Sequence, residues 1–142
     1  MAGTARRAAA TTTSATLAAI SALHVAWGLR LDLPGVDADA MRDAAVGSDT
    51  VPSPAACFAV AGLLGTAAVL VAGRPMRHPF IRRTGQLGVA ATLGARSALG
   101  FTGNTDLVAP APTSERFSEL DRRVYSPLCA ALAFGALLAV RR

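Results

Sequence analysis

The sequence predicts an all-α protein, a four-helix transmembrane bundle that forms a single domain over residues 1–142. The first observation is composition: 52% of the residues are hydrophobic and only 16% are charged, whereas soluble chains carry about 25% charged residues. The second is that the apolar residues fall into four runs, three of them near the length that crosses a bilayer and the fourth shorter. The third is that the charges are segregated between the intervening segments, as membrane topology requires.

The first predicted span covers about residues 10–29, directly after Arg6 and Arg7. An arginine pair ahead of an apolar run is also how a secretory signal peptide begins. This run, however, is longer than a signal peptide needs, and three further apolar runs follow it. We therefore expect a retained first helix and keep the cleaved signal peptide as the alternative.

A polar segment at residues 31–51 contains five aspartates and leads into the second span. Residues 37–46, followed by Gly47, predict a short surface helix. Ser53 and Pro54 then match a helix N-cap followed by proline at the first helical position. The second span is expected at residues 54–73.

The third span is expected at about residues 84–101, after a short basic loop with two prolines. A loop rich in Gly, Pro and Asn follows at residues 103–112, and a partly amphipathic helix is expected from about 113 to Tyr125. The apolar run after Pro127 is only about 14 residues, or ~21 Å, which is too short to cross alone. We therefore place the fourth span at residues 120–140, preceded by the amphipathic helix and bent near Pro127, where proline removes a backbone donor.

Charge by segment predicts the orientation of the four spans. The fourteen basic residues are all arginine; eight lie in the N-terminus, the middle loop and the C-terminus, which contain no acid. All nine acidic residues lie in the first and third loops. The positive-inside rule then predicts a multi-pass protein of the inner (plasma) membrane with both termini in the cytoplasm. The same distribution leaves no basic polar face for nucleic acid, so nucleic-acid binding is excluded despite a net charge of +5.

Arg96 is the single charge within the third span. A charge inside a span costs at least ~2.5 kcal/mol and normally has a partner. Asp121 or Glu119, at the outer side of the fourth span, is the expected partner. The alternative is that the Arg96 side chain extends to the outer headgroups without a partner.

Three further polar or aromatic residues are predicted at the same outer level. His24 and Trp27 are three residues apart and so share a helix face, and Tyr125 stands one turn after Asp121. A core histidine and interfacial aromatics are the simpler interpretations. The alternative is one outward-opening pocket lined by His24, Trp27, Arg96, Asp121 and Tyr125, because polar groups within a membrane are solvated by each other, by water or by a ligand.

Cys57 and Cys129 are expected at similar depth, so that a disulfide between the second and fourth spans is geometrically feasible. Small apolar fillers are the simpler interpretation of both residues. No metal is expected, because His24 and His78 are predicted on opposite sides of the membrane. No cofactor is expected either, because no phosphate-binding glycine motif is present.

Four stretches of the chain resemble the DUF3995 family of small four-helix bacterial membrane proteins. They are His24-Val-Ala-Trp27-Gly28, Ala59-Val-Ala-Gly-Leu63, Arg96-Ser-Ala-Leu-Gly100-Phe101 and the run from Phe117 to Cys129, with its Tyr-Ser-Pro-Leu-Cys ending. The first loop departs from the resemblance, being longer and richer in Asp. The resemblance implies a four-span membrane protein and no assigned activity.

Three functions are compatible with these features. The first is a membrane protein whose outer polar pocket binds a small or amphiphilic ligand through Arg96, Tyr125 and Trp27. The second is a membrane-embedded enzyme of isomerase or cyclase type acting on an isoprenoid or lipid-like substrate, with Asp121, His24 and Glu119 as acid–base groups. The third, a small multidrug transporter, lacks the expected acid in the first span. The expected partners are the lipid bilayer and an amphiphilic small molecule; a homo-oligomer stays open.

Overall fold

The computed structural model describes residues 2–31, 35, 37–47, 51–73, 78–107 and 114–140. Every regular element within these ranges is helical. The long helices are α1 (Ala2–Gly28), α3 (Pro54–Ala72), α4 (Pro79–Thr102) and α6 (Ser126–Val140). The short elements are α2 (Ala38–Ala45), a 3-10 turn η1 (Thr105–Leu107), α5 (Glu115–Leu120) and a π-helical turn η2 (Asp121–Tyr125). The all-α fold class is confirmed.

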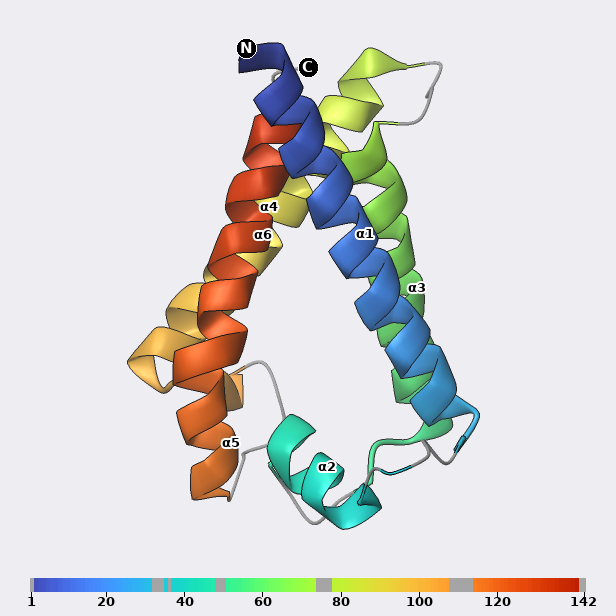
Figure 1. Cartoon of the computed structure of the whole chain (residues 1–142), viewed down its shortest axis with the longest axis vertical. Coiled ribbons are helices and arrows are strands. Elements are labelled where there is room, and N and C mark those ends of the chain that lie inside the picture. The colour runs from blue at the N-terminus through green and yellow to red at the C-terminus, as the bar shows by residue number, and fades with distance from the viewer. Residues whose placement is uncertain are drawn as a thin grey trace.

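The helices form two pairs, with α1 packed chiefly against α3 and α4 chiefly against α6. The pairs converge at the end that holds both termini and diverge toward the other end, where α2 lies between them (Figure 1). A core of small and branched side chains holds the convergent end, in which Ala10, Leu17 and Ala136 are fully buried. Hydroxyl groups add contacts within the first pair: Ser14 and Ser21 donate to the carbonyls of Ala68 and Ala61 at 2.8 and 2.7 Å.

The structure confirms the predicted start of α3. Ser53 is the N-cap, and its Oγ accepts a hydrogen bond from the Ala56 N–H at 3.2 Å. Pro54 occupies the first turn, where its missing N–H costs nothing. At the other end Gly73 adopts a φ of 64°, the left-handed conformation that glycine favours at a helix C-terminus.

Two long helices begin earlier than predicted. We expected spans from residues 10 and 84, whereas α1 begins at Ala2 and α4 at Pro79. Arg6, Arg7, Arg82 and Arg83 therefore lie within helices. Arginine is a good helix former, and its charge ends an apolar run without ending the helix. The basic loop was expected at residues 74–83. Residues 79–83 instead form the start of α4, and residues 74–77 lie outside the described part of the chain.

The last helix is continuous through α5, η2 and α6, with helix on both sides of Pro127 as predicted. The irregular part is a π turn over Asp121–Tyr125, in which the Ser126 N–H bonds the Asp121 carbonyl. It lies directly ahead of Pro127, whose missing N–H leaves the preceding turn without one of its donors. A wider turn at this point is a common feature of functional sites.

Two helices among the described residues are long and apolar enough to cross a membrane, Pro54–Ala72 and Glu115–Val140. Both are mostly unburied within the protein. Large apolar side chains on them face outward, including Leu63 at 72% and Phe134 at 62% exposure.

Candidate functional site

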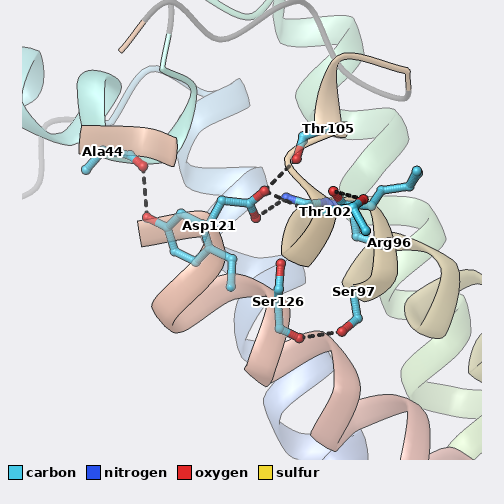
Figure 2. Close-up of polar contacts among 9 residues, drawn as sticks. Ala44, Arg96, Ser97, Thr102, Thr105, Asp121 and Ser126 are labelled. Atoms are coloured by element: carbon cyan, nitrogen blue, oxygen red, sulfur yellow. Dashed lines mark hydrogen bonds and ion pairs between the residues drawn. The ribbon is translucent and has the colours of Figure 1, made fainter. Parts of the chain in front are cut away.

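The divergent end of the molecule contains a buried ion pair between α4 and η2. Arg96 Nη2 lies 2.6 Å from one carboxylate oxygen of Asp121, and Nη1 donates to the other at 3.3 Å (Figure 2). The Asp121 side chain is 3% exposed and that of Arg96 is 27% exposed. The predicted partner of Arg96 is therefore present, and the unpaired interpretation of Arg96 is not supported.

The Asp121 carboxylate also accepts a hydrogen bond from outside the pair. Thr105, in the turn η1 after α4, donates its hydroxyl to Asp121 at 2.6 Å (Figure 2). The carboxylate thus receives three donors, two of them from a cation. This arrangement holds the end of α4 against the π turn.

Two serines and a glycine complete the crossing of α4 and α6. Ser97 donates to the Ser126 carbonyl at 2.8 Å, while the Ser126 Oγ is fully buried and has no hydrogen-bond partner. Gly100 allows the close approach: a Cβ there would stand 1.8 Å from Ser126 Oγ and 2.9 Å from the Asp121 carboxylate. Only glycine fits this position without displacing the ion pair.

Sequence reasoning gave no role to Ser97, Gly100, Thr105 or Ser126. Ser97, Gly100 and Ser126 lie in the stretches of sequence that resemble the DUF3995 family, and this resemblance was the signal that could have identified them. Thr105 lies in a loop whose path the sequence did not predict.

His24 and Trp27 form a second group, on α1. Their rings are in edge contact with centroids 5.0 Å apart. His24 Nδ1 bonds the Ile20 carbonyl at 2.8 Å, and the Trp27 Nε1–H points to the Met41 sulfur of α2 at 3.2 Å. The prediction that the two residues share a helix face is confirmed.

Tyr125 joins the other side of the site to α2. Its hydroxyl donates to the Ala44 carbonyl at 2.9 Å, and its ring lies near Phe117. Hydrogen bonds therefore connect α2 to α1 through Trp27 and to η2 through Tyr125. Among the described residues no hydrogen bond, ion pair or ring contact joins His24 or Trp27 to Arg96, Asp121 or Tyr125 directly. The pocket shared by all five residues stays a prediction.

Glu119 lies apart from these groups. It pairs with Arg123 at 3.0 Å, one turn along the helix, and both side chains are largely exposed. A shallow depression of about 300 Å³ lies beside them, lined by Ser118, Glu119, Arg122 and Arg123. Glu119 is therefore not the partner of Arg96.

The two cysteines are free thiols, with Cys57 buried and Cys129 partly buried. The disulfide considered from the sequence is absent from the structure. No group of three or more potential metal ligands occurs among the described residues.

The family model described as "Protein of unknown function (DUF3995)" matches residues 17–136, which include the ion pair and both bonds to α2. The chain belongs to the DUF3995 family. No curated protein and no solved structure matches this DUF3995 chain.

Proposed function

We propose that this DUF3995 protein is a four-span protein of the plasma membrane that holds an amphiphilic small molecule between its two helix pairs, at the outer side. The observation that carries the proposal is a change in burial along the facing sides of α1 and α6. The facing residues are buried at the inner end and only partly buried at the level of His24 and Tyr125.

Length and surface support four spans. About 20 residues cross a hydrocarbon core, and α1 and α4 have 27 and 24 residues. The candidate spans α3 and α5–α6 present apolar side chains outward, a surface that a soluble monomer rarely exposes over so large an area. Lipid tails are the natural contact for this surface.

Charge supports the orientation. The described basic residues at the end that holds the termini are Arg6, Arg7, Arg82 and Arg83. The described acidic residues all lie in α2, η1, α5, η2 or beside them, at the opposite end. Over the whole sequence, eight arginines belong to the N-terminus, the middle loop and the C-terminus and six lie elsewhere, so the positive-inside rule predicts that the first end is cytoplasmic.

Burial along α1 supports a space between the pairs at the outer side. Ala10, Thr13 and Leu17 are 0–5% exposed, and Gly135 of α6 packs directly on Thr13. His24 continues the same face of α1, eleven residues after Thr13, yet it is only partly buried. The packing between the pairs therefore loosens from the inner end to the outer end.

Burial along α6 changes in the same direction. Ala136 and Ala139 are 0% and 2% exposed, whereas Leu128 is 37% exposed and Tyr125 and Cys129 are partly buried. The residues at this level, Leu128 and Cys129 with His24 and Tyr125, combine apolar and polar groups, which suits one aliphatic chain and a small polar head.

The geometry favours binding over acid–base catalysis. Both oxygens of the Asp121 carboxylate are engaged by Arg96 and Thr105, and its side chain is only 3% exposed, so that it is not presented to a ligand. Glu119 is exposed and paired with Arg123. His24 is the third group that was expected to act as an acid or base. Its Nδ1 is hydrogen-bonded to Ile20, so only its Nε2 is free.

Trp27 is the only tryptophan and provides the test. A long-chain alcohol brominated at mid-chain, added to the purified protein in detergent, is expected to quench Trp27 fluorescence saturably. The control variant Trp27→Phe/Phe80→Trp moves the reporter to the exposed start of α4, where quenching is expected to rise without saturation. Identical, unsaturable quenching of both proteins would rule out a bound chain near Trp27.

A further inference from the structure

Two buried polar atoms at the inner end of α4 have no hydrogen-bond partner in the described chain. One is a donor, the Nε of Arg82; the other is an acceptor, the Oε1 of Gln86. Gln86 follows Arg82 at a spacing of i, i+4, so that both side chains lie on one face of the helix. Gln86 is only 1% exposed, and burying such a group without a partner costs of the order of a lost hydrogen bond.

The orientation of the Gln86 amide is fixed by α3. Its Nε2 donates to the Leu70 carbonyl at 2.9 Å, next to the C-terminal Gly73. Turning the amide over would place two oxygens against each other, so Oε1 must remain the free atom. The helices are also close here, since a Cβ on Gly85 would stand 2.8 Å from the Leu70 side chain. The free acceptor is therefore a built feature of the α3–α4 contact.

A hydroxyl group satisfies both atoms at once. Its oxygen accepts from the Arg82 N–H while its hydrogen is donated to the Gln86 oxygen. Both atoms have almost no accessible surface and Arg82 is partly exposed, so a ligand reaches them when the Arg82 side chain moves aside. A phosphate or carboxylate oxygen satisfies Arg82 alone, because it has no proton for Gln86.

The charged residues near Arg82 and Gln86 favour an anionic ligand. Arg6, Arg7, Arg82 and Arg83 lie at this end of the molecule, and no acidic residue of the described chain accompanies them. Uncompensated arginines at the cytoplasmic interface attract anionic headgroups. Exposed Phe80 and Ile81, at 77% and 55%, place the start of α4 among lipids.

We propose that this face of α4 binds the headgroup of an anionic glycerophospholipid, phosphatidylglycerol, in the inner leaflet. The phosphate lies against the arginine side chains, and a glycerol hydroxyl bridges Arg82 Nε and Gln86 Oε1. This site rests on the membrane placement proposed above and is independent of the outer amphiphile.

The test compares lipids that differ in one feature. Full-length protein in a neutral detergent is titrated with phosphatidylglycerol, phosphatidylmethanol or phosphatidylcholine of identical chains, and retained lipid is measured by native mass spectrometry. Phosphatidylmethanol keeps the charge and lacks the hydroxyl. We expect phosphatidylglycerol to be retained about fivefold more tightly than phosphatidylmethanol, the ratio that one hydrogen bond gives, and phosphatidylcholine least.

Two variants test whether Arg82 and Gln86 cause the preference for phosphatidylglycerol over phosphatidylmethanol. Gln86→Leu and Arg82→Lys are each expected to remove the difference between the two anionic lipids while keeping the preference over phosphatidylcholine. Arg83→Lys, at the exposed neighbour, is expected to keep both. Equal retention of the two anionic lipids by the wild-type protein would mean that water alone fills the position, and equal retention of all three would exclude an anionic site. Neither result affects Trp27 quenching, which reports the other end of the molecule.

Discussion

Arg96 and Asp121 are the residues on which the divergent end of the structure depends. The sequence predicted that Arg96 pairs with Asp121 or Glu119, because a charge in an apolar run needs a partner and few acids were within reach. It did not predict the geometry of the pair. The third donor, Thr105, and the space left by Gly100 depend on how α4 crosses the π turn, which no spacing along the chain reveals.

Replacing Arg96 tests how much the buried ion pair contributes to stability, compared with the exposed pair of Arg123 and Glu119. Arg96→Ala leaves the buried Asp121 carboxylate uncompensated and is expected to lower stability by about 3 kcal/mol. Arg123→Ala breaks the exposed pair with Glu119 and is expected to cost less than ~1 kcal/mol. Thermal unfolding in detergent measures both. Equal, small shifts would show that Asp121 is not held by Arg96.

Gly100→Ala tests the close approach of α4 and α6. The added methyl group would overlap Ser126 Oγ and crowd the ion pair, so we expect a loss of about 1–3 kcal/mol. Gly88→Ala, in the same helix with nothing within 4 Å, is the matched control and is expected to be neutral or stabilising. The double variant Gly100→Ala/Ser126→Ala is expected to recover part of the loss. Equal behaviour of the two glycine variants in thermal unfolding would contradict the packing described.

At the scale of elements, helices were predicted better than their boundaries. The N-cap at Ser53 and Pro54 was predictable because capping is local chemistry. The starts of α1 and α4 were not, because arginines continue a helix beyond its apolar part. The short helix α2 was expected near residues 37–46, but its place between the two helix pairs depends on tertiary contacts to Met41 and Ala44.

Tyr125→Phe tests how α2 is held. The variant keeps the ring and removes the hydrogen bond to Ala44, so that α2 is expected to open about fivefold more often, as the loss of one hydrogen bond predicts. Hydrogen–deuterium exchange of residues 38–47 is expected to accelerate by that factor, while α4 is unchanged. Exchange as slow as in the wild-type protein would mean that α2 is held by other contacts.

At the scale of the whole molecule, the sequence predicted four apolar runs and an all-α fold, and the structure confirms the fold class. The arrangement as two pairs that diverge at one end was not predictable, because it depends on which small residues allow close packing. Thr13 and Gly135 close one end through direct contact. His24 continues the face of Thr13 on α1 and is only partly buried.

Membrane topology is the property on which the proposed ligand site and the proposed lipid site both depend. Single cysteines at Gly3, Arg83 and Asn104, in a background with Cys57 and Cys129 replaced by alanine, test it directly in intact cells. An impermeant thiol reagent is expected to label the protein at Asn104, in the exposed turn after α4, and to leave Gly3 and Arg83 unlabelled until the membrane is permeabilised. Labelling of Gly3 and Arg83 in intact cells, with Asn104 protected, would contradict the orientation and both sites built on it.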